Sequence, residues 1–69
     1  MKAANKCIEL LALGINTEQG EDDKVILYSA SMPKAEVRIT RNEFIDLPPA
    51  IIIGMLIVAG YDLALEEAI

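Results

Sequence analysis

Side chains that could do chemistry are sparse in this chain of 69 residues, and the densest group of them is acidic. Residues 16–23 read NTEQGEDD, with carboxylates at Glu18, Glu21, Asp22 and Asp23. Calcium takes carboxylate ligands, but these four do not follow the twelve-residue calcium loop, which alternates its ligands around a central glycine and ends in glutamate. We therefore expect a solvated acidic loop here and no metal site.

Nucleophilic catalysis has little to draw on in this sequence. The chain contains no histidine and a single cysteine, Cys7, so neither a Ser-His-Asp triad nor a Cys-His pair can form within it. Ser29 and Ser31 lie on or beside a predicted strand without a nearby base, and the adjacent acids at 22–23 and 66–67 are typical of a solvated surface. The sequence predicts no catalytic residue, no cofactor and no enzymatic activity.

The cysteine content also bears on the compartment. One cysteine cannot form a disulfide within the chain, which is typical of proteins from reducing compartments. The apolar residues near the N-terminus are not followed by a convincing Ala-x-Ala cleavage site, so a secretory signal is not predicted. We expect Cys7 to be a small buried residue on a helix face, and the protein to be cytoplasmic.

Net charge argues against a nucleic-acid partner. Six Lys and Arg against eleven Asp and Glu give a formal charge of −5, whereas nucleic acids bind to clusters of basic residues that displace counterions. Lys34, Arg38 and Arg41 could form a small basic patch along one strand and its exit. A solvated strand face with local ion pairs is the preferred interpretation of these three residues.

The strongest signal in the sequence is an apolar run. Residues 47–61 read LPPAIIIGMLIVAGY and carry no charge. A helix that is apolar all round must be covered by core, membrane or another subunit, and a chain this short has little material to cover it. The run falls short of the roughly 20 residues that span a bilayer, and Asp62 closes it. The sequence therefore favours association with another subunit over a membrane anchor.

The N-terminal segment is predicted to form a helix. Residues 2–13 place apolar side chains at the three-and-four spacing of an amphipathic helix. Gly14 can then take the left-handed conformation that ends a helix, with Ile15 folding back as the hydrophobic residue that commonly follows.

A β-hairpin is predicted after the acidic loop. Residues 24–31 are rich in β-branched and aromatic side chains, and residues 35–40 alternate apolar with polar ones. Residues 32–34 are expected to form the hairpin tip, because Pro33 fixes a turn dihedral and cannot donate to a strand ladder. The N-terminal helix is expected to cover the apolar face of this hairpin, because two strands alone are marginal.

Two helical segments are predicted after the hairpin. Thr40 and Glu43 have the spacing of a capping box, which should start a short helical turn. Leu47 should be extended because it precedes a proline, and Pro49 suits the first position of a second helix. That helix should run over residues 50–69, since the segment lacks period-two alternation and ends in good helix formers. A buried third strand over residues 50–58 is the alternative, because this stretch is rich in β-branched residues.

These elements define one α+β domain over residues 1–69. Its expected order is helix, strand, strand, helix, with a short helical turn before the last helix, and with the helices on one face of a small antiparallel sheet. On a helical wheel, one edge of the C-terminal helix carries small residues that allow close approach of another backbone. The predicted interface residues are Ile53, Gly54, Ile57, Gly60, Tyr61, Ala64 and Ala68.

The function class follows from size, surplus apolar surface and the scarcity of reactive groups. We expect a small acidic interaction module that forms a homo-oligomer, most simply a dimer, and acts on a protein partner as a regulator, inhibitor or accessory factor of the kind that phages and mobile elements encode. The alternatives are a structural assembly subunit, by analogy of element order with small phage head-completion proteins, and a nucleic-acid-binding module.

Overall fold

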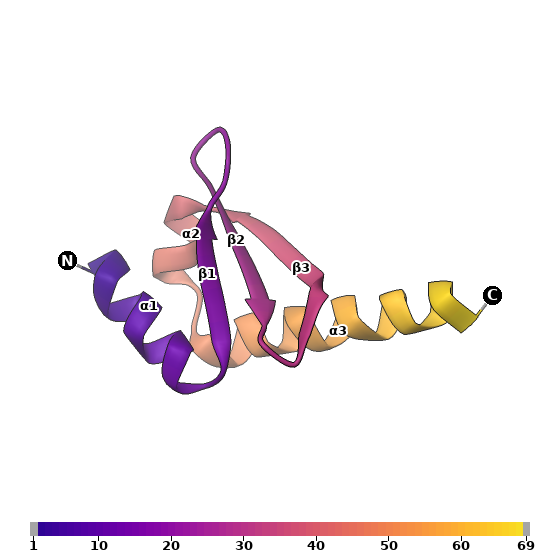
Figure 1. Ribbon diagram of the computed structural model, residues 1–69. Coiled ribbons are helices and arrows are strands. Elements are labelled where there is room, and N and C mark those ends of the chain that lie inside the picture. Colours follow the sequence, from indigo (N-terminus) through magenta and orange to yellow (C-terminus); the bar gives the residue numbers. More distant parts are fainter. Residues whose placement is uncertain (1, 69) are drawn as a thin grey trace.

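The computed structural model describes residues 2–68 as three helices and one three-stranded sheet (Figure 1). The sheet is antiparallel with the strand order β1-β2-β3, and the predicted α+β fold class is confirmed. The elements, in chain order, are α1 (Lys2–Ala12), β1 (Ile15–Gln19), β2 (Lys24–Ser29), β3 (Met32–Thr40), α2 (Arg41–Asp46) and α3 (Pro49–Ala68).

The end of α1 follows the sequence prediction. The backbone amides of Leu13 and Gly14 donate to the carbonyls of Leu10 and Leu11 at 2.9 and 3.0 Å, and Gly14 has a φ of +81°. This left-handed residue reverses the chain, so that Ile15 turns back into the core, where it is buried.

The prediction that residues 16–23 form a loop is wrong for its first half. β1 pairs antiparallel with β2, from Ile15 opposite Ser29 to Gln19 opposite Val25. A polar segment can form this strand because β1 lies at the edge of the sheet and its polar side chains can point to solvent. The loop is reduced to residues 20–23, where Asp22 and Asp23 adopt positive φ angles of 53° and 62°.

The hairpin between β2 and β3 also differs from the prediction. Its tip lies at Ala30 and Ser31, whereas residues 32–34 belong to β3. The register shifts between Tyr28, which faces Glu36, and Ser29, which faces Met32, so β3 carries extra residues there. Pro33 falls within this irregular stretch of an edge strand, where a missing amide donor is tolerated.

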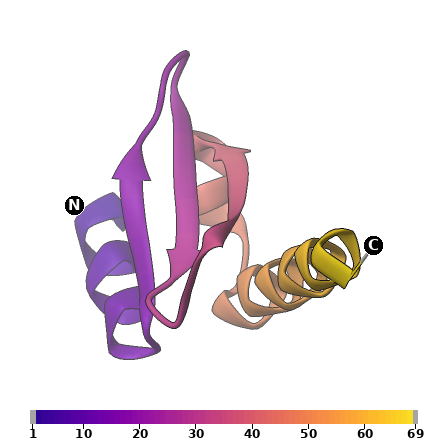
Figure 2. The same ribbon diagram turned by 45° about the vertical axis from the view of Figure 1, so that its right-hand side comes forward.

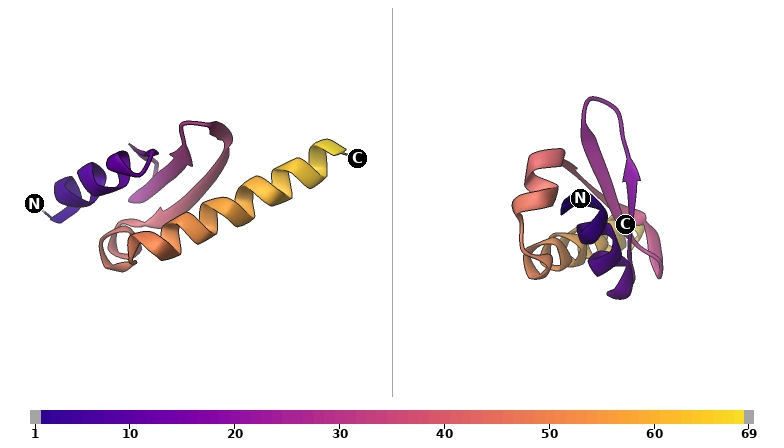
Figure 3. Two further views of the ribbon diagram at one scale, coloured as in Figure 1. Left: turned by 90° about the horizontal axis from the view of Figure 1, so that it is seen from below. Right: turned by 90° about the vertical axis from the view of Figure 1, so that its left-hand side faces the viewer.

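All three helices lie on one face of the sheet (Figures 2 and 3). α1 packs against β1, α3 packs against β3, and α2 contacts α1 and the two strands β2 and β3. The opposite face of the sheet is largely polar and carries Glu18, Tyr28, Glu36 and Arg38. The molecule is therefore two layers thick, with its core between them.

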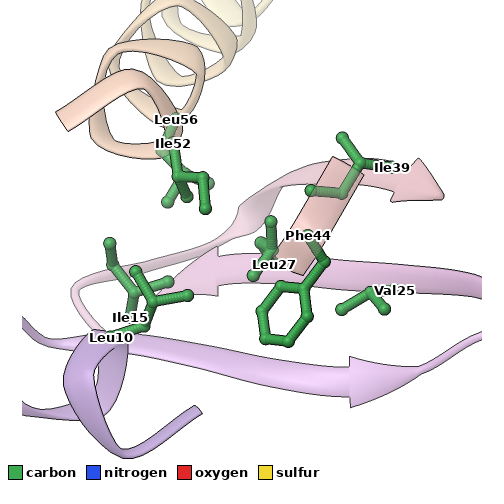
Figure 4. Packing of buried hydrophobic residues seen from close by; sticks show 8 residues of the cluster. All are labelled: Leu10, Ile15, Val25, Leu27, Ile39, Phe44, Ile52 and Leu56. Carbon is green, nitrogen blue, oxygen red and sulfur yellow. The ribbon is translucent and has the colours of Figure 1, made fainter. Parts of the chain in front are cut away.

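The core is a single cluster to which every element contributes (Figure 4). α2 supplies Phe44, which lies over the middle of the sheet and is 2% exposed. Cys7 is half-buried at the edge of this cluster, as a small residue on α1 should be. The buried residues are Leu10, Ile15, Val25, Leu27, Ile39, Phe44, Ile52 and Leu56.

The connection between β3 and α3 matches the sequence prediction in detail. The Thr40 hydroxyl accepts from the Glu43 amide at 3.1 Å, and a Glu43 carboxylate oxygen accepts from the Thr40 amide at 3.0 Å, which completes the capping box. Leu47 is extended, with φ −70° and ψ 134°, and its carbonyl accepts a hydrogen bond from the Lys6 ammonium. α3 begins at Pro49, so the alternative of a third strand over residues 50–58 is wrong.

Candidate interaction surface

α3 is attached to the domain along one side only. Its buried residues are Ile52, Leu56 and Gly60, which recur every four positions on one face of the helix. A Cβ atom on Gly60 would lie 3.0 Å from the Met32 sulfur, so α3 approaches β3 closely at this glycine. Beyond it the helix runs past the sheet (Figures 1 and 3). The side chains of residues 64–68 are exposed.

The side of α3 that faces away from the sheet is apolar along its whole length. It carries five of the nine large apolar side chains that are exposed in the described chain, and each of the five is 50–68% exposed. Glycine and alanine occupy the positions between them. We call this surface the outer face of α3, and its residues are Ile51, Gly54, Ile57, Val58, Tyr61, Ala64, Leu65 and Ala68.

An apolar groove of about 460 Å³ borders this face. Ile53, Ile57 and Tyr61 of α3 form one wall, and Leu13 and Met32 contribute to the rest of the lining. Ile57 and Tyr61 therefore belong both to the groove and to the outer face of α3. The groove lies between α3 and the start of β3, and through these two residues it is continuous with the outer face.

The acidic residues of α3 leave the outer face free of charge except at one margin. With about 3.6 residues per turn, Glu66 and Glu67 fall on the same side of α3 as Ile52 and Leu56. In the earlier turns of the helix, this is the side that packs against the sheet. Because α3 has passed the sheet by then, both carboxylates are exposed to solvent. Asp62 lies at the edge of the outer face, next to Val58 in a shallow hollow beside Val37.

The residues that the sequence analysis considered for catalysis or metal binding make only local hydrogen bonds in the structure. Within residues 2–68, no group of three or more His, Cys, Asp or Glu side chains is placed to hold a metal ion. The Cys7 sulfur accepts a hydrogen bond from the Thr17 hydroxyl at 3.2 Å, and the hydroxyl oxygens of Ser29 and Ser31 lie 2.8 Å apart.

Two ionisable groups are perturbed by hydrogen bonds of this local kind. The Tyr28 hydroxyl donates to Glu18 at 3.0 Å across the solvent face of the sheet, which raises the tyrosine pKa because the bond and the nearby negative charge favour the protonated form. The bonds from the backbone and side chain of Thr40 lower the pKa of Glu43.

Of the three basic residues considered for a nucleic-acid patch, Arg38 forms an ion pair with a neighbouring acid. The Arg38 guanidinium donates to the Glu36 carboxylate from Nη2 at 2.9 Å and from Nε at 3.2 Å, across a two-residue spacing on the same strand face. Lys34 and Arg41 are exposed at opposite ends of β3. The Arg38–Glu36 pair is a local ion pair of the kind that the sequence analysis expected on this strand.

The seven predicted interface residues occupy different parts of this surface. Gly54, Ile57, Tyr61, Ala64 and Ala68 lie on the outer face of α3, whereas Ile53 is half-buried in the groove wall and Gly60 packs against the sheet. Sequence reasoning missed Ile51, Val58 and Leu65, which the three-and-four spacing of the outer face could have indicated. The groove residues Leu13 and Met32 could not have been found, because only the fold brings them to α3.

Comparison with protein-family models, with curated proteins and with solved structures finds no match for this chain. By length and composition alone, α3 could cross a membrane. The function must therefore be argued from the surface itself.

Proposed function

We propose that this protein is a small non-enzymatic interaction module that self-associates through the outer face of α3. The observation that carries the proposal is the position of the exposed apolar residues: of the nine large ones in the described chain, seven lie on one helix face or in its adjoining groove, and two lie on α1. Apolar residues scattered singly are ordinary on a soluble protein, whereas a contiguous apolar patch marks an interaction site.

The charges of α3 favour a protein subunit over a lipid bilayer as the partner that covers its apolar outer face. Asp62, Glu66 and Glu67 lie in the last two turns of the helix, and a carboxylate inside a bilayer is expensive. Helices that lie on membrane surfaces are rich in Lys and Arg, whereas the charged residues of α3 are all acidic. A second subunit can cover the apolar face and leave these carboxylates in water.

In this proposal the oligomer acts as a regulator, inhibitor or accessory factor by binding another protein. The surface opposite the helices, with Glu18, Glu36 and the acidic loop at residues 20–23, stays free when α3 is covered. An acidic surface of this kind is complementary to a basic partner surface and would speed the encounter with it.

A pair of matched substitutions tests the self-association. Leu65→Glu puts a charge on the outer face of α3, and Leu11→Glu makes the same change at a leucine of α1 that is similarly exposed, 62% against 50%. We expect light scattering behind size-exclusion chromatography to give a monomer for Leu65→Glu and a dimer for Leu11→Glu and the unmodified chain. A dimer that survives Leu65→Glu but is lost in Leu11→Glu would contradict the proposal.

A further inference from the structure

The outer face of α3 contains, over about two and a half heptads, a spacing that is also found in paired helices. Ile51, Val58 and Leu65 recur every seven residues, and Gly54, Tyr61 and Ala68 do so three residues later. This alternation of three and four is the a and d pattern of a two-helix coiled coil. Ile52, Leu56 and Gly60, which hold α3 to its own domain, lie on the opposite side, so the seam is free in the folded chain.

The sizes of the side chains on this seam favour an antiparallel partner. In a parallel pair each layer would join identical residues, which would place glycine opposite glycine and tyrosine opposite tyrosine. In the antiparallel pair an a position meets a d position, and Leu65 then faces Gly54, Tyr61 faces Val58 and Ile51 faces Ala68. Each of the larger side chains meets a smaller one, which is the condition for filling a core without voids or strain.

Gly54 gives this register independent support. A glycine inside a helix costs about 1 kcal/mol relative to alanine, and Gly54 is exposed in the interior of α3, where an alanine would fit. Within the described chain, a Cβ atom at Gly54 would have no neighbour within 4 Å. The fold of one copy gives no steric reason for the glycine, whereas a leucine from a second copy would occupy the space above it.

Charge favours the same orientation. A parallel pair would bring together Asp62, Glu66 and Glu67 of both copies, along with the negative ends of both helix dipoles. In the antiparallel pair the acidic end of each α3 lies beside the start of the other, where the helix dipole is positive and no acidic residue occupies the first turn. The ammonium of Lys6 is also near that end, because it donates to the Leu47 carbonyl.

The available area is of the right order for a dimer. The five large side chains of the outer face are each half to two thirds exposed, which amounts to roughly 600 Å² if a whole large side chain presents about 200 Å². Specific interfaces bury about 800 Å² per partner. The glycine and alanine positions of the seam and the margin of the groove can supply the difference.

We propose that two copies of this chain pair through antiparallel α3 helices, with Leu65 of each copy over Gly54 of the other and the two Val58–Tyr61 layers at the centre. This inference rests on the self-association proposed above and adds its partner, orientation and register. The two domains then lie on opposite sides of the helix pair, because each sheet covers the side of α3 that faces away from the seam.

Disulfide cross-linking tests the register. In a Cys7→Ser background, one sample carries Gly54→Cys and another carries Leu65→Cys, and each is oxidised alone and after mixing. The antiparallel pair brings residue 54 of one copy beside residue 65 of the other, within the short Cα separation that a disulfide needs. Residues 54 of the two copies are offset by eleven positions, or about 16 Å along the helix. We expect a cross-linked species in the mixture and none from either variant alone.

A neighbouring position provides the control. Glu66→Cys lies one residue from Leu65 but on the sheet side of the helix, so it should not cross-link with Gly54→Cys. Circular dichroism of each reduced variant confirms that it is folded, and Gly54→Cys has space within its own chain.

The outcomes separate this inference from the proposed function. A cross-link from Gly54→Cys alone would show a parallel pair and overturn the register. A dimer by mass that gives no cross-link in the mixture would overturn the register and leave self-association standing. A monomer by mass would overturn both, as would a monomer that floats with phosphatidylcholine vesicles.

Discussion

The two glycines of α3 have opposite surroundings. Gly60 lies against β3, where an added Cβ would come within 3.0 Å of the Met32 sulfur and 4.0 Å of the Ala35 Cβ. Gly54 lies on the outer face, where the described chain leaves space for a side chain. The first glycine serves the packing of the domain, and in the proposed dimer the second would face Leu65 of the other copy.

Leucine at each of these two positions should therefore have different effects. Gly60→Leu wedges α3 away from β3 and should lower the free energy of unfolding by roughly 1–3 kcal/mol, as overpacking does. Gly54→Leu should leave the single domain folded but overfill the layer with Leu65 and weaken the dimer. Urea unfolding at high dilution, where a dimer dissociates, measures the first effect, and light scattering at higher concentration measures the second. Equal losses of stability in both variants would contradict this assignment.

Glu43 gives the fold a defined pH dependence. Its hydrogen bonds to Thr40 lower its pKa in the folded protein, so the stability that they contribute is full above the ordinary glutamate pKa and is lost as the pH falls through the lowered value. On acidification, the free energy of unfolding should fall less in Glu43→Gln than in the unmodified chain. Glutamine can accept the same hydrogen bond from the Thr40 amide, but it has no group that becomes protonated. Chemical unfolding at a series of acidic pH values measures this difference, and two parallel pH profiles would contradict it.

At the scale of elements, the sequence predicted those with strong local signals. The cap at Thr40, the break at Leu47 and the start at Pro49 depend on neighbouring residues, and all three are confirmed. β1 was missed because its sequence is polar and its pairing with β2 is not a local property. The hairpin tip was misplaced because Pro33 is a turn residue by type but lies in an irregular edge strand.

Adjacent isoleucines separate the two roles of α3. Ile52 is 0% exposed in the core, whereas Ile51 is 51% exposed on the outer face. Ile52→Ala should lower the free energy of unfolding by about 2–5 kcal/mol through the lost contacts and the cavity. Ile51→Ala should lower the unfolding free energy of the monomer much less and weaken the dimer instead.

Comparing the two variants at high dilution, where a dimer dissociates, isolates the effect on the single chain. Thermal unfolding followed by circular dichroism is a suitable measurement. If Ile51→Ala cost as much as Ile52→Ala under these conditions, the outer face would be part of the fold and not a docking surface.

At the scale of the whole molecule, the surplus apolar surface has a structural origin. The sequence indicated it through residues 47–61, and the prediction that this run needs a partner stays a prediction. The sequence alone did not predict how the apolar residues of α3 are divided between a side that packs against the sheet and an exposed outer face. That division arises because α3 packs against β3 with only the side that carries Ile52, Leu56 and Gly60, so its other side stays exposed.

The proposed self-association would make the stability of the molecule depend on its concentration. A dimer that dissociates on unfolding gains about 1.4 kcal/mol for each tenfold rise in concentration, so the unfolding temperature should rise accordingly. Calorimetry over a hundredfold range of concentration measures the rise. Leu65→Glu should remove the dependence and Leu11→Glu should keep it, whereas a concentration-independent transition for the unmodified chain would contradict a dimer.

The central claim is that the outer face of α3 joins two copies of this chain, and the mass of the unmodified protein in dilute buffer tests it most directly. Sedimentation equilibrium at micromolar concentration should give twice the mass of one chain, with dissociation to a single chain on further dilution. Circular dichroism on the same samples establishes that the protein is folded. A folded monomer throughout the micromolar range would contradict the claim.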